Sequence, residues 1–378
     1  MTESAIPEHL RLERALPAKT PGNYRPPFPF YTARYPKNAV DLVMAVLGAQ
    51  FPSPADPNIA KAMAKLSSFV SSGSVSSLAR PQFYEVASVT DAIGYYNKTI
   101  ISYWASTAAY KQWTAQSGFQ QWWDALDPKQ QPHGWFIEAF FPTMDRIETV
   151  FNTNEIIEGA GHMRESLSGP IAEHAYWGSM RDRLPVAQRD PLDGDKPGWS
   201  ERSSTATITA KSHVRVDGTR NLAVIRSGQD WKDTSPAERE LYLGEMRPVL
   251  AKGMNYLRDC GDEIGCYSCR LMDIVDGGAA EESDRTFGLA YFDNLASLER
   301  WSREHPTHLD IFGGFMRYAK KLQNNIGLRL FHEVLVLKPE QQLFEYVGCH
   351  SATGMLTGVN GHPRKWGSQE PLGQRPRG

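Results

Sequence analysis

The sequence predicts an α+β fold made of two similar halves, in which antiparallel sheets pack together and helices lie outside. Two observations support this prediction. The chain contains an internal repeat, and each copy alternates strand-like and helix-like segments in the same order. A length of 378 residues with 41% hydrophobic residues is also sufficient to bury a large core.

The repeat is clearest between residues 102–123 and 290–312, where a β-rich run leads into a helix with tryptophan on its apolar side. Two further pairs of strand-like stretches match, 134–141 with 329–336 and 42–51 with 222–231. The identical or similar pairs are Tyr103 and Tyr291, Trp104 and Phe292, Ala108 and Ala296, Tyr110 and Leu298, Trp113 and Trp301, Phe136 and Phe331, Glu138 and Glu333, and Gly48 and Gly228.

Each copy therefore has the order strand, long helix, strand, strand, helices, strand, which predicts two pseudo-symmetric ferredoxin-like halves of the dimeric α+β barrel type. In the second copy, the long helix is expected at 235–259, because Ser235 and Glu238 have capping-box spacing and Gly261 follows its end. The predicted organisation is an extended N-terminal segment (1–37), a first half (38–150), a connecting segment (151–220), a second half (221–350) and a C-terminal tail (351–378).

Charge and composition exclude several classes of function. A formal net charge of -2 gives no electrostatic basis for binding nucleic acid or an anionic membrane. The first residues lack the pattern of a signal peptide, and no uncharged apolar run reaches the length of a membrane span, so we expect a cytoplasmic protein. Cys260, Cys266 and Cys269 lie close together and could suggest zinc, but their spacing favours reduced, partly buried thiols.

The differences between the two copies indicate where function lies. The second copy has His308, His332 and Ser227 where the first has Gln120, Ile137 and Leu47. Taken singly, a histidine on an apolar strand or a serine at a strand end is more often structural than catalytic. Together they place a possible metal ligand, an acid/base group and a hydroxyl in one half only.

His308 is predicted to lie in the first turn of a helix at 307–322, with Thr307 as its N-cap. Gly313 and Gly314 would each cost about 1 kcal/mol inside this helix unless something approaches it closely. A flat macrocycle would explain them, so His308 is a candidate axial ligand of a haem, with His305 as the alternative. No CxxCH sequence is present, which predicts a non-covalent b-type haem.

Several long strings resemble the aldoxime dehydratases, haem enzymes that convert R-CH=N-OH to a nitrile and water. These strings are "HAYWGSMRDRLP" (174–185), "IRSGQDW" (225–231), "LERWSREHPTHLDIF" (298–312), "LRLFHEV" (328–334) and "QLFEYVGCHSATGML" (342–356). The resemblance extends from about residue 21 to about residue 356. It implies the same pair of ferredoxin-like halves that the internal repeat predicts.

The resemblance also implies roles for individual residues. His308 matches the proximal haem ligand, the second histidine of "HPTH", and His332 matches the distal catalytic histidine. Ser227 matches the serine that holds the oxime hydroxyl. Arg181 matches its partner arginine, with Arg183 as the alternative two residues on.

Further positions match the family less directly. Glu138 lies where the family has a distal glutamate that assists catalysis, and Phe315 and Leu330 match pocket-lining positions. Phe30 stands where some members have a pocket methionine. Extra residues at 324–327 lengthen the loop before the strand of His332.

The implied mechanism uses ferrous haem to bind the oxime through nitrogen, with His332 as general acid and base and Glu138 keeping it protonated. The expected partners are a small aldoxime and a second copy of the chain in a homodimer. Alternatives are a haem peroxidase or chlorite-dismutase-like enzyme, a haem sensor, or a binding module without a cofactor. The sequence leaves open whether the oxime is aliphatic or aryl.

Overall fold

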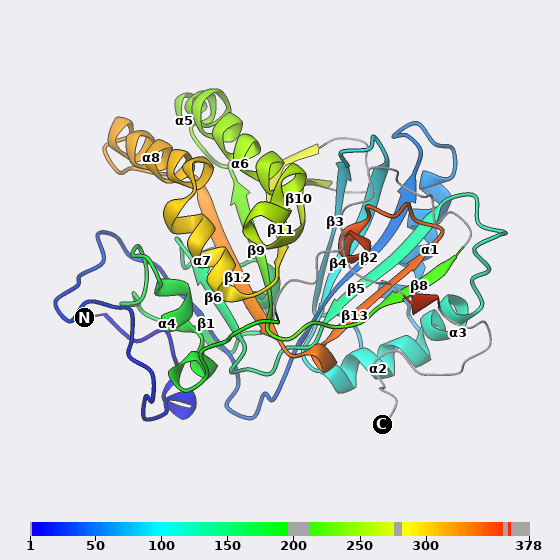
Figure 1. The fold of residues 1–378 in the computed structure, drawn as a ribbon, viewed down its shortest axis with the longest axis horizontal. Helices are drawn as coiled ribbons and strands as arrows, with labels where there is room; N and C mark the ends of the chain where they lie inside the picture. Colours follow the sequence, from blue (N-terminus) through cyan, green and yellow to red (C-terminus); the bar gives the residue numbers. More distant parts are fainter. Residues whose placement is uncertain (1, 196–211, 276–281, 358–361, 364–378) are drawn as a thin grey trace.

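The computed structural model describes residues 2–195, 212–275, 282–357 and 362–363. Within these ranges, a 12-stranded sheet curls back on itself, and helices cover its outer face (Figure 1). Large side chains from both halves meet between the inner faces, as Met44 and Tyr103 do with Phe287 and Phe331. The prediction of a mixed fold with antiparallel sheet and external helices is confirmed.

The strand order in the large sheet is β14-β8-β13-β5-β2-β4-β3-β10-β11-β9-β12-β6, and β1 and β7 form a separate ladder. The strand bounds are β1 (Ala33–Arg34), β2 (Val43–Phe51), β3 (Phe83–Thr90), β4 (Tyr96–Trp104), β5 (Gly134–Phe140), β6 (Ile147–Phe151), β7 (Ser166–Leu167), β8 (His213–Val216), β9 (Leu222–Asp230), β10 (Cys266–Val275), β11 (Glu282–Phe292), β12 (Arg329–Leu337), β13 (Gln342–Val347) and β14 (His362–Pro363).

Helices α1 to α3 cover the first half, and α5 to α8 cover the second (Figure 1). The helix bounds are α1 (Ile59–Val70), α2 (Thr107–Gln116), α3 (Phe119–Asp124), α4 (Ser179–Arg183), α5 (Pro236–Leu241), α6 (Arg247–Asp259), α7 (Leu295–Glu304) and α8 (Pro306–Lys321). The long helix predicted at 235–259 is thus two α-helices joined by a π-helical turn, Tyr242–Met246.

The two halves have the same strand order, β5-β2-β4-β3 in the first and β12-β9-β11-β10 in the second. The sequence predicted two separate sheets packed together, but the two sheets are joined into one. Strand β3 pairs with β10 at Ser88 and Asp273, Ala87 and Ile274, and Val86 and Val275. An unpaired edge strand exposes its backbone donors and acceptors, and joining the two edges satisfies both at once.

Two caps decide where helices begin. The side chain of Ser235 accepts a hydrogen bond from the amide of Glu238, which confirms the predicted start of α5. The prediction for α8 was wrong by two residues. The N-cap is His305, whose Nδ1 accepts from the amide of Thr307, because Pro306 already occupies the first helical position.

Candidate functional site

One face of strands β9 and β12 is partly open, although the rest of these strands is mostly buried. Ile225, Ser227, Leu330 and His332 are half-buried, and alternation places them on the same face. At the corresponding places in the first half, Leu47 and Ile137 are buried beneath the aromatic side chains of α2 and α3. The second half therefore has a hollow where the first has a packed core.

His332 lies at the centre of this open face. It is the direct partner of Ser227 across the β9–β12 ladder and of Val150 across the β6–β12 ladder. Burial, together with the positive charge of Arg183 and the proximity of His308, lowers the pKa of His332 to about 4. The imidazole is therefore neutral near pH 7 in the cofactor-free protein.

Helix α8 faces the hollow with His308, Phe312 and Phe315, which share one side of the helix at 100° per residue. Trp301 of α7 contacts the imidazole of His308 edge to face, with ring centroids 4.7 Å apart. Burial lowers the pKa of His308 to about 4, although the main chain of Ser302 opposes this. Its buried Nδ1 makes no well-aligned hydrogen bond among the described residues.

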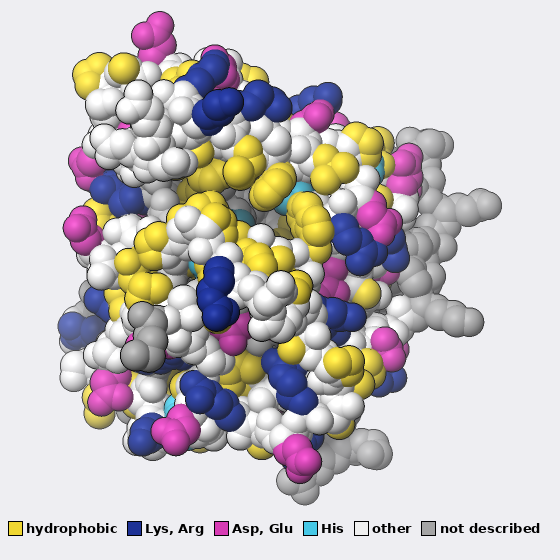
Figure 2. Space-filling view, turned by 90° about the vertical axis from the view of Figure 1, so that its left-hand side faces the viewer, with side chains coloured by type: hydrophobic (Ala, Val, Ile, Leu, Met, Phe, Trp, Pro, Cys, Tyr) yellow, Lys and Arg dark blue, Asp and Glu magenta, His cyan; other side chains and the backbone are white. Residues whose placement is uncertain are grey.

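Figure 2 shows this side of the molecule, with a depression rimmed by hydrophobic side chains and histidine atoms visible inside it. The predicted pocket residues lie around this hollow. Phe315 and Leu330 belong to one apolar cluster between α8 and the strands. Phe30 packs on Val150, the cross-strand neighbour of His332.

The structure gives the two candidate arginines different surroundings. Arg181 is bound by both carboxylate oxygens of Glu299 and by the carbonyl of Pro191, at 2.7–3.1 Å, on the side of α4 that faces α7. Arg183 is the arginine whose charge acts on His332. A five-residue helix turns 200° between these two positions, so they point to different surroundings.

The structure also places Glu138 away from His332. This carboxylate is fully buried between the two halves, where it accepts hydrogen bonds from Arg270, Tyr291 and Tyr346. It cannot reach the open face of β12, because it belongs to the inner face of the sheet. Its repeat partner Glu333 likewise accepts from Tyr103, so each half supplies the tyrosine for the other half's glutamate.

The acidic residue on the side of His332 is Glu148, which the sequence reasoning missed. It lies on β6 two residues before Val150, on the same face as His332. Its carboxylate accepts hydrogen bonds from Nε and Nη2 of Arg183 at 2.7 and 2.8 Å, and both side chains are buried. A charged residue inside the alternating apolar run "IETVF" was the signal that could have identified it.

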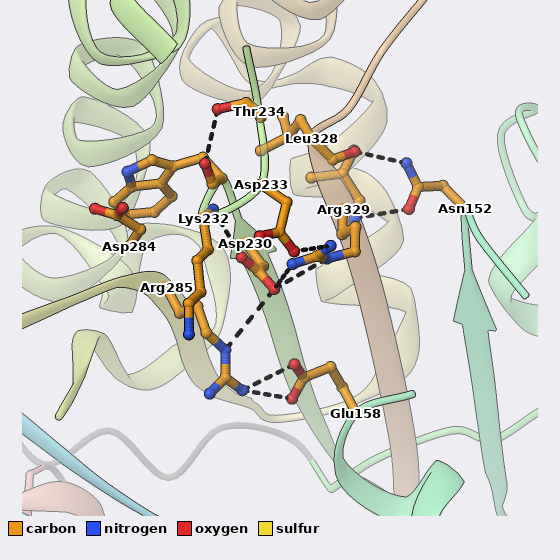
Figure 3. A network of polar contacts seen from close by, with 12 residues as sticks. Asn152, Glu158, Asp230, Lys232, Asp233, Thr234, Asp284, Arg285, Leu328 and Arg329 are labelled. Atoms are coloured by element: carbon orange, nitrogen blue, oxygen red, sulfur yellow. Dashed lines mark hydrogen bonds and ion pairs between the residues drawn. The ribbon is translucent and has the colours of Figure 1, made fainter. Parts of the chain in front are cut away.

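The loop at 324–327 is firmly attached to the strand of His332. The carboxylate of Glu238 accepts from the amides of Gly327 and Leu328 at 2.9–3.0 Å, and it also accepts from the hydroxyl of Tyr318. The side chain of Asn152, which follows the last residue of β6, bridges the carbonyl of Leu328 and the amide of Leu330 (Figure 3). The lengthened loop therefore leaves the register of β12 fixed.

A polar network reinforces the same end of the strands. Arg329 donates to Asp230 and Asp233, and Arg285 pairs with Glu158, all within 3.0 Å (Figure 3). These contacts join β11, β9 and β12 to the segment that precedes β7. They fix the strands that carry Ser227 and His332.

The glycines of α8 have a different role from the one predicted. A Cβ on Gly314 would lie 3.3 Å from Sδ of Met246 in the π-helical turn, so this glycine permits close packing of two helices. A Cβ on Gly313 would meet only the tip of Arg317.

The cysteines do not form a ligand set. Cys266, Cys269 and Cys349 are buried, and burial raises the pKa of the Cys269 thiol to about 12. The described ranges hold no group of three or more His, Cys, Asp or Glu side chains arranged for a metal ion. Nor does any helix in the described part of the chain combine the length and apolar character needed to cross a membrane.

The hollow thus brings two imidazoles and a serine hydroxyl together beside apolar side chains, and such a site can accept a flat apolar group. The chain matches the family model "Haem-containing dehydratase" over residues 45–355. It is 39% identical to the aliphatic aldoxime dehydratase of Pseudomonas chlororaphis, covering 94% of this chain and 97% of that protein. It therefore belongs to the haem-containing dehydratase family, and the resemblance to the aldoxime dehydratases is confirmed.

Two further comparisons agree. The phenylacetaldoxime dehydratase of Bacillus sp. (strain OxB-1) is 30% identical, covering 89% of this chain and 93% of that protein. A crystal structure of an aldoxime dehydratase in complex with butyraldoxime superposes with a TM-score of 0.86. It is 35% identical, covering 95% of this chain and 97% of that one.

The residues of the hollow fit the haem of this family. A haem needs one strong axial ligand from the protein and apolar walls against its faces. His308 is neutral near pH 7, the state in which an imidazole binds iron, and Phe312 and Phe315 lie beside it on α8. His332 and Ser227 approach the hollow from the sheet.

Proposed function

We propose that this protein dehydrates aldoximes to nitriles on a ferrous b-type haem held by His308. The observation that carries the proposal is the direct pairing of His332 with Ser227 on the open face of the sheet, opposite α8. The names of the relatives support the substrate class. The non-covalent attachment of the haem follows from the absence of a CxxCH sequence in the chain.

A ferrous haem bound here would supply an electron-rich iron that activates the N–O bond of the oxime. His308 would hold the iron through a neutral imidazole, whose basicity would tune the electron density available there. Ser227 fixes the direction of the oxime hydroxyl by hydrogen bonding. These contacts orient the leaving oxygen toward His332.

His332 moves one proton within the substrate. The overall reaction R-CH=N-OH → R-C≡N + H₂O removes a proton from carbon and adds one to the departing hydroxyl, so the histidine ends each cycle unchanged. A general acid–base of this kind contributes about 10²–10⁴-fold to the rate. With a pKa of about 4, His332 begins as a neutral base in the cofactor-free protein.

Arg183 and Glu148 take the roles that the sequence gave to Arg181 and Glu138. The guanidinium of Arg183, held on two sides by Glu148, directs positive charge toward His332 and the hydroxyl that leaves. Glu148 keeps this charge in position and balances it. The ion pair thereby stabilises negative charge that develops on the oxime oxygen.

We further propose that residues 38–150 and 221–350 are pseudo-symmetric ferredoxin-like halves. Their common strand order and the exchange of tyrosine–glutamate contacts between them support this. Residues 151–220 then form the connection between the halves, although 196–211 of it lie outside the described residues, as does most of the tail 351–378. A homodimer and a cytoplasmic location stay predictions.

The test is an absorption spectrum of the purified protein before and after dithionite, followed by anaerobic addition of butyraldoxime or phenylacetaldoxime. We expect a Soret band that shifts on reduction and again with the oxime, and we expect nitrile by gas chromatography without peroxide. A haem protein that instead consumes peroxide and makes no nitrile would support a peroxidase-like enzyme. A Soret band that ignores both oximes would favour a sensor.

A further inference from the structure

One short segment, 175–183, reaches both sides of the hollow. It begins with Ala175 at φ +59° and Gly178 at φ +99°, and these left-handed residues enclose Tyr176 and Trp177. Helix α4 follows at once and ends with Arg183 on the side of His332. Left-handed backbone is unfavourable for alanine, so neighbouring contacts must hold the turn in this shape.

Trp177 points from this turn toward His308 and Phe312, on the side of the hollow that α8 forms. Its ring lies edge to face with His308, with centroids 6.1 Å apart, and it contacts Phe312 at 5.5 Å. Trp301 contacts His308 from α7 at 4.7 Å. The imidazole is therefore held by two indoles, one from the buried core and one from the surface.

Trp177 and Phe312 are unusually exposed for large apolar side chains, at 43% and 44%. The two rings are in contact and form one exposed apolar patch. Covering this patch with another apolar group would remove its surface from water, which is favourable. Trp177 and Phe312 therefore have surface left to cover beside His308, whereas Trp301 is buried. The body that the proposed function places beside His308 is the haem.

The segment is tethered so that Trp177 cannot swing away freely. Arg181 is bound to Glu299 of α7 through two nitrogens at 2.8–3.1 Å, and both side chains are mostly buried. Tyr176 donates to Asp182, which also accepts from the amides of Lys19 and Thr20. One ion pair thus attaches the turn to the helix that supplies Trp301.

We propose that Trp177 is a haem-retention residue, which holds the imidazole of His308 in position and covers the proximal edge of the haem, and that Arg181–Glu299 is its tether. His308 needs such support because it lies in the first turn of α8, where main-chain amides lack helical partners and helices fray. The inference rests on the proposed role of His308. In this inference, Arg181 positions Trp177 by attaching its turn to α7.

The test measures the rate at which haem transfers from the loaded protein to excess apomyoglobin. We expect Trp177→Ala to release haem about tenfold faster, as loss of an aromatic contact and its covered area implies. Trp177→Phe should restore most of the retention. Arg181→Gln and Glu299→Gln should each speed release, and the double variant should be no faster than the single ones, because both remove one interaction.

Tyr84→Ala is the matched control, since Tyr84 on β3 has the same exposed fraction of 43% and lies in the first half. Its release rate should equal that of the unmodified protein. Wild-type release by Trp177→Ala would overturn the inference. If Trp177→Ala does not fold, Trp177→Leu decides, because it keeps an apolar side chain without the ring and should still release haem faster.

Different results would overturn the proposed role of His308 and the proposed role of Trp177. Loss of haem in His308→Ala together with wild-type release in Trp177→Ala would overturn the role of Trp177 alone. Full haem binding by His308→Ala would overturn the proximal assignment and the retention role with it.

Discussion

His332 and Ser227 are direct partners across the β9–β12 ladder, and both side chains point to the half-exposed face of the sheet. Because side chains alternate along a strand, a slip of β12 by one residue would replace His332 on this face with Phe331 or Glu333, which belong to the buried inner face. The register of β12 against β9 therefore decides whether the hollow holds an imidazole beside the hydroxyl of Ser227.

His308→Ala should abolish stable haem binding, since it removes the axial ligand from α8. The measurement is the Soret absorbance per protein after haem reconstitution, with pyridine haemochrome for haem content. His305→Ala is the matched control. It removes the N-cap contact with Thr307 and should cost about 1 kcal/mol of stability while haem stays bound.

His332→Ala should keep haem and lose turnover by about 10²–10⁴-fold, because it removes the proton-transfer group and leaves the ligand intact. Nitrile formation under anaerobic, reducing conditions gives the rate, and the Soret band confirms haem content. Turnover within a few-fold of the unmodified protein would contradict the role of His332.

Arg183→Gln and Arg181→Gln separate the two arginines. The first should lower kcat strongly, by about 10²-fold or more, because the charge near His332 and the partner of Glu148 are lost together. The second should leave kcat of the haem-loaded enzyme almost unchanged, since Arg181 is engaged with Glu299. The opposite result would restore the original choice of Arg181.

Glu148→Gln and Glu138→Gln should differ in their effect on turnover. Glu148→Gln leaves the buried Arg183 without its counter-ion, so it should lower the free energy of unfolding by about 3–5 kcal/mol and also lower the turnover of the folded fraction. Glu138→Gln leaves the buried Arg270 without its counter-ion, so it should lower the free energy of unfolding by about 3–5 kcal/mol with no specific loss of chemistry in the folded fraction. Urea unfolding and haem-normalised turnover distinguish the two.

The contribution of His174 to the stability of the cofactor-free protein should rise with pH between about 4 and about 6.5. Burial, assisted by the charge of Arg183, lowers the pKa of His174 to about 4, whereas an unfolded histidine has a pKa of about 6.5. In this window the unfolded chain binds more protons, so the free energy of unfolding increases with pH and is lost again as pH falls. His174 is only 3% exposed, and its contribution is at most about 3 kcal/mol.

His174→Phe should flatten this dependence, measured by urea unfolding at several pH values across the window. Some slope should remain, because His133, His308 and His332 have pKa values lowered in the same direction. An unchanged slope in the variant would show that His174 is not titrating as a buried neutral group.

The sequence by itself determined the repeat, the strand and helix order of each half, and the residues that one copy has and the other lacks. These features depend on periodicity and on side-chain type, and both can be read along the chain. His308, His332 and Ser227 were found this way, and the structure brings all three to one hollow. The family resemblance added the reaction class, since long strings with rare residues identify relatives.

Only the tertiary structure decided which charged groups lie near His332. Arg181 and Arg183 are both charged residues of one short helix, and their separate environments depend on the rotation of α4 against α7 and the sheet. Glu138 was assigned by the family resemblance, but alternation puts it on the inner face with Glu333, whereas Glu148 shares the face of His332. Local sequence sets which side of an element a residue occupies, and packing between distant segments sets what that side meets.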